Sequence, residues 1–262
     1  MTRDRRPVSW IAGCGLLLVL SLAPAVVQAQ EADHLLLSEV AVITRPPLDR
    51  FGSPFIEVVN PTGEAIELGD VYLSTAQDVA NGRFYWNIVA GASQGGGTGG
   101  NFHCRFPVGA VIAPGDTMVI ALNGNTEFAQ AYGHQPDLEL YEEGLAPDAI
   151  PDMREAFPGA IGAGLGSTGA NTPQLQNGAG ADDSIVLYHW DGASDLVTDL
   201  DYLVYGDATN VRVDKTGVSI DGPDAGDEPS AYLADTAPAD QTVASGSPTF
   251  GQSFMRAGAV EN

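Results

Sequence analysis

The chain has 262 residues, with 11 lysine and arginine residues against 34 aspartate and glutamate residues, and a formal net charge of −23 at pH 7. A surface this acidic repels the phosphates of nucleic acids and anionic lipids, so the composition argues against nucleic-acid binding. The chain is long enough to bury one sizeable hydrophobic core.

The first 29 residues have the pattern of a secretory signal peptide. Three arginines lie within the first six residues, a leucine-rich run follows, and Ala29 ends a cleavage site of small residues. We expect cleavage after Ala29 and a secreted, periplasmic or cell-surface protein. Removing these residues takes away three arginines and one aspartate, which changes the net charge from −23 to −25. The alternative is a lipoprotein, because residues 11–14 match a lipobox ending in Cys14, although this box precedes the leucine-rich run.

After the leader, the sequence predicts neither a membrane-spanning helix nor a disulfide bond. No apolar run there approaches the roughly 20 residues of a membrane-spanning helix, so we expect no membrane insertion after cleavage. Cys104 would be its one cysteine, so we expect no intramolecular disulfide.

Short alternating runs rich in β-branched and aromatic residues, separated by turn residues, predict an all-β fold. The clearest stretch is residues 53–74, predicted as two short strands around a turn in which Pro61 lacks an amide hydrogen and Gly63 tolerates positive φ. Glu57 and Glu67 are expected on the polar faces of these strands. The predicted strands cover residues 34–43, 55–59, 65–68, 71–73, 102–106, 111–112, 117–122, 183–190, 195–205 and 252–256.

Two long segments interrupt these strands, at about residues 76–101 and 124–181. In the first, an inserted strand over residues 83–89 is one interpretation, and a glycine-rich loop follows. In the second, Thr126 is expected to cap a short helix over residues 127–132 that ends at Gly133. Long loops on a rigid scaffold often carry binding, so these insertions are the expected places for specificity.

Several blocks of the sequence, in the same order, resemble the lamin tail domain, an immunoglobulin-like β-sandwich found in nuclear lamins and in many exported bacterial proteins. The blocks are residues 35–42, 55–74, 104–122, 182–202 and 251–256. The resemblance implies a single lamin-tail-like β-sandwich domain over residues 34–262, and a binding or structural module rather than an enzyme. Tyr72 stands where the family pattern has a tryptophan, and the two insertions inherit nothing from the family.

Two catalytic motifs appear without the structural context that they need. Residues 91–95 match G-x-S-x-G around Ser93, but the glycines that follow do not start the helix of a nucleophile elbow. Residues 164–169 match G-x-G-x-x-G, but no strand precedes them and no helix is expected after them. We therefore assign no catalytic and no cofactor-binding residue.

Metal binding is a weaker possibility in the acidic segment from residue 214 to residue 240. Its loops are dense in carboxylates, the ligands that calcium prefers, yet they lack the spacing of a known calcium loop, and a solvated acidic loop explains them equally. These carboxylates belong to Asp214, Asp221, Asp224, Asp227, Glu228, Asp235 and Asp240. The four histidines, at positions 34, 103, 134 and 189, lie on separate segments with no zinc-ligand spacing. No metal ligand is assigned from sequence alone.

The sequence thus predicts a non-catalytic extracellular or periplasmic binding or structural module, for adhesion or surface attachment, with an unknown protein or cell-surface partner. Phe84, Tyr85 and Trp86 could form a flat recognition surface or simply cover the end of the sandwich. The alternative function is a secreted hydrolase, or the accessory domain of one, acting on phosphoesters or polysaccharide. Lamin-like filament assembly is disfavoured because no heptad repeat is present.

Overall fold

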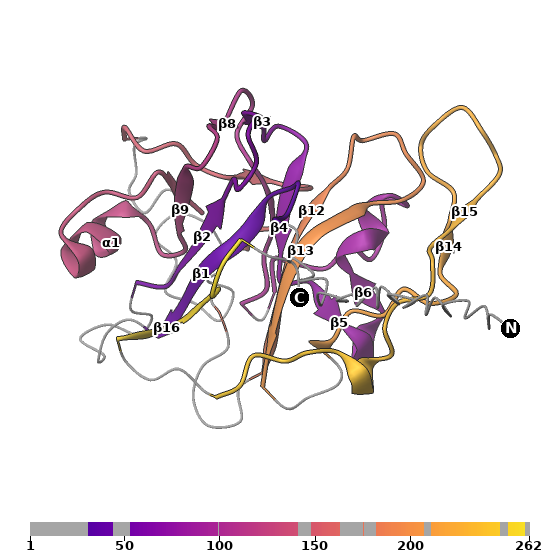
Figure 1. The fold of residues 1–262 in the computed structure, drawn as a ribbon. Coiled ribbons are helices and arrows are strands. Elements are labelled where there is room, and N and C mark those ends of the chain that lie inside the picture. The colour runs from indigo at the N-terminus through magenta and orange to yellow at the C-terminus, as the bar shows by residue number, and fades with distance from the viewer. Residues whose placement is uncertain are drawn as a thin grey trace, which may run out of the picture.

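The structure is a computed structural model that describes residues 31–43, 53–98, 100–140, 148–162, 175, 182–206, 211–246 and 251–259. Two five-stranded sheets form its frame (Figure 1). The first sheet contains, in spatial order, β10 (Leu138–Glu139), β9 (Thr117–Ala121), β2 (Phe55–Val59), β1 (Leu36–Ile43) and β16 (Gln252–Met255). The second contains β11 (Arg154–Glu155), β7 (His103–Arg105), β4 (Val71–Ser74), β12 (Asp183–His189) and β13 (Thr198–Tyr205).

Smaller elements connect and cover these sheets. Neighbouring strands within the sheets are antiparallel except β9 and β10, which are parallel. The two-stranded pairs are β3 (Ile66–Glu67) with β8 (Val111–Ile112), β5 (Gln77–Asp78) with β6 (Arg83–Phe84), and β14 (Ser219–Ile220) with β15 (Ser230–Ala231). One α-helix, α1 (Asn125–Tyr132), and 3-10 helices at Val79–Asn81, Tyr85–Ile88 and Pro238–Asp240 complete the elements named here.

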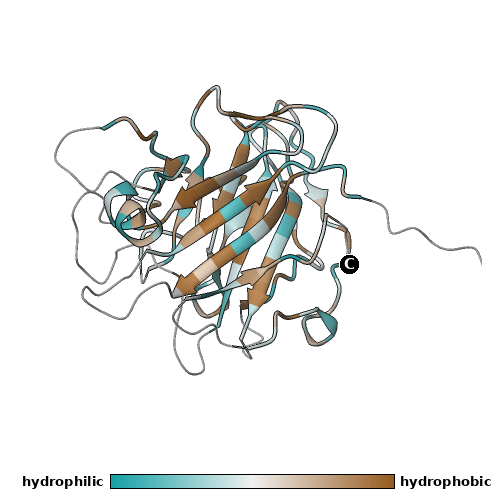
Figure 2. Cartoon of the chain, turned by 60° about the vertical axis from the view of Figure 1, so that its left-hand side comes forward, coloured by the Kyte–Doolittle hydropathy of each residue, from teal (hydrophilic) through white to brown (hydrophobic). Residues whose placement is uncertain are grey.

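The main core lies between the two sheets. Ile56 and Val58 of β2 are buried in it together with Leu73 of β4 and Leu187 of β12. Figure 2 shows brown, apolar positions along the strands of the sandwich. Burial of alternate residues on facing strands is what a two-layer β fold requires. The protein is therefore an all-β sandwich, which confirms the predicted fold class.

The stretch at residues 53–74 crosses from one sheet to the other. Its two main strands, β2 and β4, belong to different sheets, and the short β3 lies between them and pairs with β8. The turn after β2 is fixed by the buried Asn60, whose Nδ2 donates to the carbonyl oxygens of Glu64, Ile112 and Ala113. This turn therefore joins the two layers, rather than closing a hairpin between paired strands.

The first insertion covers the outer face of the second sheet. Only Arg83–Phe84 of the possible strand at residues 83–89 is extended, and Tyr85–Ile88 forms a 3-10 helix, so the longer strand is wrong. Its side chains join a second buried group, which we call the outer cluster. It comprises Tyr72, Ala76, Tyr85, Trp86, Ile88, Val89, Val186, Tyr188, Val197 and Val213.

The described parts of the second insertion add edges and a cover to the sandwich. Residues 138–139 and 154–155 provide the outermost strands β10 and β11 of the two sheets. The helix α1 begins at Asn125 after the N-cap residue Gly124, so Thr126 lies inside the helix and is not its cap. It ends at Gly133, as predicted, where φ is +79°. Phe128 of α1 packs edge-on against Phe55, with ring centroids 5.8 Å apart, and so covers the first sheet.

Candidate binding groove

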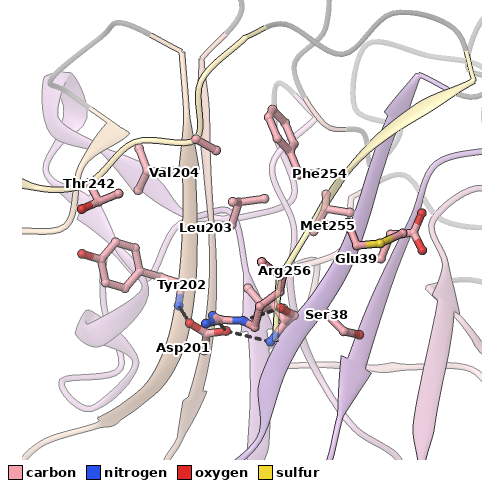
Figure 3. Close-up of a pocket in the computed structure, with 14 residues that line it drawn as sticks. Ser38, Glu39, Asp201, Tyr202, Leu203, Val204, Thr242, Phe254, Met255 and Arg256 are labelled. Carbon is pink, nitrogen blue, oxygen red and sulfur yellow. Dashed lines mark hydrogen bonds and ion pairs between the residues drawn. The ribbon is translucent and has the colours of Figure 1, made fainter. Parts of the chain in front are cut away.

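A cavity of about 440 Å³ lies between the strands that end the two sheets (Figure 3). β16 is the outermost strand of the first sheet and β13 is the outermost strand of the second. Residues of β1, β13 and β16 line the cavity together with Thr242 and Ala244. We call it the edge groove. Its volume is in the range of pockets that hold small ligands or a few peptide side chains.

An ion pair forms the polar part of the edge groove. Arg256 Nη2 pairs with Asp201 Oδ2, and Leu37 N donates to the same carboxylate oxygen over 2.7 Å. Arg256 Nε also donates to Leu37 O over 3.1 Å. Burial raises the pKa of the Asp201 carboxyl above its usual value, against the opposing effect of the Arg256 guanidinium. These contacts tie β13, β1 and the residue just after β16 together.

Apolar side chains form the remaining walls and the rim. Phe254 packs against Tyr205, with ring centroids 5.1 Å apart, and it also contributes to the lining. Met255 and Tyr202 at the rim are exposed by 71% and 39%. Large apolar side chains that stay exposed beside a cavity are typical of a surface that contacts a partner.

Irregular pairing of β1 shapes this edge. The register of β1 shifts against β2 between Leu37 and Glu39, and against β16 between Val40 and Ile43. Ser38, at the first shift, donates through Oγ to Glu57 Oε1 over 2.6 Å. Bulges of this kind occur at sheet edges and next to binding sites, where they redirect side chains.

The acidic segment brings two of its predicted residues together with a third that the sequence did not indicate. Asp221 and Asp224 lie beside Asp195, with one carboxylate oxygen of each within 4.8 Å of the others. Asp195 already accepts hydrogen bonds from Gly222 N and from Ser230 Oγ. Desolvation, followed by repulsion from Asp195 and its acidic neighbours, raises the pKa of Asp221. Calcium binding at this trio stays a prediction, because exposed acidic groups also gather without an ion.

The four histidines are not brought together. His103 is fully buried, hydrogen-bonded through Nε2 to the Tyr188 hydroxyl, and burial lowers its pKa to about 3. His34 lies beside Asp33 near the start of the described chain, and His134 follows α1. Among the described residues, the aspartate trio brings three possible ligand atoms within 4.8 Å of one another, and no such group includes a histidine.

The remaining sequence candidates divide between buried, exposed and undescribed positions. Tyr85 is fully buried and Trp86 is exposed by 2%, so they do not form a flat recognition surface and instead cover the second sheet. Ser93 lies exposed in a turn at φ +55°, and the described residues just after it form no helix. Residues 164–169, like the leader at residues 1–29 with Cys14, lie outside the described residues. Cys104 is a buried free thiol whose pKa is raised by burial.

No protein-family model matches the chain, and no curated protein matches it. Among solved structures, the chain is similar to the crystal structure of a DUF4876 family protein from Bacteroides thetaiotaomicron VPI-5482, with 14% sequence identity and a TM-score of 0.41. The match covers 69% of this chain and 56% of that chain, so this chain spans little more than half of that protein's length. Within the described residues, no helix has the length and apolar character needed to cross a membrane.

Sequence patterns did not indicate the edge groove, because its walls come from the first, the late and the last strands. The ion pair between Asp201 and Arg256 joins residues 55 positions apart. Tyr202 of β13 and Met255 of β16 are exposed, but a single exposed apolar residue in a strand does not indicate a groove. Which strands end the sheets is a property of the topology, and alternation within one strand does not reveal it.

Proposed function

We propose that the protein is an exported, non-catalytic binding module of lamin-tail type that recognises an extended polypeptide segment of a partner in the edge groove. The observation that carries the proposal is the position of this groove between the two strands that end the sheets. An extended peptide bound beside a sheet edge gains main-chain hydrogen bonds from the edge strand and specificity from side-chain pockets. The net charge of −23 favours a basic or neutral segment over an acidic one.

Existing contacts leave part of this edge open to a partner. Ala244 N donates to Val204 O over 2.8 Å, so residue 244 covers one end of β13. Toward the other end, the rim residues Tyr202 and Met255 are exposed on facing strands. A peptide side chain inserted between them would reach Phe254 and the ion pair of Asp201 and Arg256 below (Figure 3).

A display library of random twelve-residue peptides, panned on the purified protein, tests this proposal. Enriched peptides should bind the wild type and Val108→Asp equally, because Val108 is 80% exposed and does not line the edge groove. Met255→Asp should weaken binding about tenfold or more, since burying a Met side chain is worth about 1.5–3 kcal/mol and 1.4 kcal/mol is tenfold in affinity. Equal binding by Met255→Asp, or no enrichment above background, would show that the groove is not the binding site.

The hydrolase alternative has its own measurement. Turnover of phosphoester, ester and polysaccharide substrates by the purified protein would support it, and abolition of ester turnover by Ser93→Ala would place the nucleophile in the turn at residues 91–95. Peptide binding and substrate turnover are measured separately on the same purified protein, so the two assays distinguish a binding module from a hydrolase.

A further inference from the structure

A lysine side chain is buried among aromatic rings in the outer cluster. The Lys215 side chain is exposed by only 7%, and its Nζ contacts Oδ2 of Asp199 on β13. The Tyr85 hydroxyl lies 3.1 Å from this Nζ and donates to Asp199, whose two oxygens are 2.8 and 2.9 Å away. Lysines are almost never buried without a specific partner. The packing around this site therefore holds the Lys215 amine in contact with the Asp199 carboxylate.

Three aromatic rings shield the amine from water. Lys215 Nζ lies 5.7 Å from the ring centroid of Tyr85, 6.0 Å from that of Trp86 and 5.5 Å from that of Tyr232. Tyr232 is held in place because Val197 N donates to its hydroxyl over 3.0 Å. Burial, and then the nearby Asp199 carboxylate, raise the pKa of Tyr85 well above its usual value, so its hydroxyl stays a donor.

A second carboxylate stands beside the pair. Asp235 Oδ2 lies 3.8 Å from Lys215 Nζ and accepts a hydrogen bond from Lys215 N over 2.5 Å. Its own amide donates to Thr216 Oγ1 over 3.0 Å, which fixes the residue. Asp235 can thus accept and return a proton at the amine without forming the closer contact that Asp199 makes.

We propose that Lys215 and Asp199 form an intramolecular isopeptide bond. A proton passes from the ammonium to the carboxylate, and the amine nitrogen then attacks Cγ of Asp199. The nitrogen–carbon bond forms, one carbon–oxygen bond of the carboxyl group breaks, and the oxygen leaves as water with two protons from the former ammonium. Asp235 carries a proton from the nitrogen to the leaving oxygen, and Tyr85 donates to the carbonyl oxygen as charge develops on it. No oxidant or other reactant is consumed.

Two features of the site favour this reaction over a lasting ion pair. The fold holds the two groups in contact, which replaces a bimolecular encounter by an intramolecular one. Shielded ions also carry a large desolvation cost that a neutral amide does not. Asp199 remains 26% exposed, which gives the released water a way out.

The bond would tie β13 to the segment that leads into β14 and β15. It would close a loop across 16 positions and anchor the hairpin that carries Asp221 and Asp224, two members of the aspartate trio. Cys104 is free and buried, so this link would supply the covalent constraint that exported proteins usually take from disulfides.

Mass spectrometry of the purified, denatured protein tests the proposal. The mass difference between wild type and Lys215→Arg should depart from the substitution alone by one water molecule, about 18 Da. Trypsin should cut after Arg212 but not after the acylated Lys215, so peptides 155–212 and 213–256 should remain joined. A wild-type mass that retains this water, with cleavage after Lys215 and peptide 155–212 released on its own, overturns the proposal.

Variants of the carboxylates separate this bond from other modifications. Asp199→Asn should lose ammonia instead of water and reach the same final mass as wild type, whereas Asp199→Ala should lose nothing. A water loss that persists in Asp199→Ala places the modification elsewhere and overturns the assignment. Asp235→Asn, expressed and purified in parallel with wild type, should carry a smaller bonded fraction, and an equal fraction removes Asp235 from the mechanism. Each of these readouts is a mass, and a circular dichroism spectrum like that of wild type shows that a variant without the bond has still folded.

Discussion

Replacing Asn60 by alanine should destabilise the sandwich more than any surface change of similar size. The side chain is fully buried at the crossing between the two sheets. Its Nδ2 lies 2.7 Å from Glu64 O, 3.1 Å from Ile112 O and 3.2 Å from Ala113 O. Its Oδ1 accepts from Thr62 N over 3.0 Å and from Thr62 Oγ1 over 2.7 Å. One side chain therefore holds together the turn after β2 and the chain before β9.

The size of the effect follows from what the alanine leaves behind. A net hydrogen bond contributes about 1 kcal/mol, and a buried group left unpaired costs about 1–3 kcal/mol. Ile112 O loses its Nδ2 contact in the buried interior, whereas Glu64 O and Ala113 O are partly reached by water. We expect Asn60→Ala to lower the free energy of unfolding by about 3 kcal/mol.

Urea denaturation followed by circular dichroism measures this change. The matched control is Asn81→Ala, because Asn81 is exposed and its Nδ2 donates to Asp78, three residues earlier, over 2.8 Å. The control should stay within about 0.5 kcal/mol of wild type. If Asn60→Ala loses less than about 1 kcal/mol, water replaces the side chain and the buried network is not what fixes the crossing.

Three further predictions concern the charge of Asp221, calcium binding and the protonation of His103. Asp221→Asn should be more stable than wild type at pH 7 and equal to it below pH 3.8, because the raised pKa of Asp221 makes its charged form unfavourable in the folded state. The calcium hypothesis predicts a higher Tm in excess calcium than in chelator for wild type and a smaller shift for Asp221→Asn, and equal Tm values contradict it. The folded-state pKa of His103 lies near 3 against 6.5 when unfolded, so stability should fall as pH drops from 6.5 towards 3. His103→Gln should flatten that slope by about 1 kcal/mol per pH unit in urea titrations at pH 6 and pH 4, and an unchanged slope contradicts the assignment.

Most strands could be predicted from the sequence because the alternation that marks them is local. The runs at residues 55–59 and 117–122 became β2 and β9 almost unchanged, because a half-buried strand shows its period within five residues. The possible strand at 83–89 did not form beyond Phe84, because aromatic residues there serve packing in a 3-10 helix as well as in a strand. The sites depended on distant pairs, such as Asp201 with Arg256 and Asp199 with Lys215, which no local pattern encodes.

The burial of β12 explains why the outer cluster exists. In β12 the six residues from Asp183 to Tyr188 are all buried, so the strand has no face for solvent. A central strand apolar on both sides in an antiparallel sheet needs a second layer on its outer face. The first insertion and residues 211–215 supply that layer, and the same layer shields Lys215 from water.

That requirement changes where specificity is expected. The sequence predicted the first insertion as a binding loop, but its aromatic side chains Tyr85 and Trp86 pack in the outer cluster with residues of β12. The edges of the two sheets have no comparable cover at Tyr202 and Met255. We therefore expect a partner to bind at the strands that close the sandwich, while the first insertion packs against the second sheet through the outer cluster.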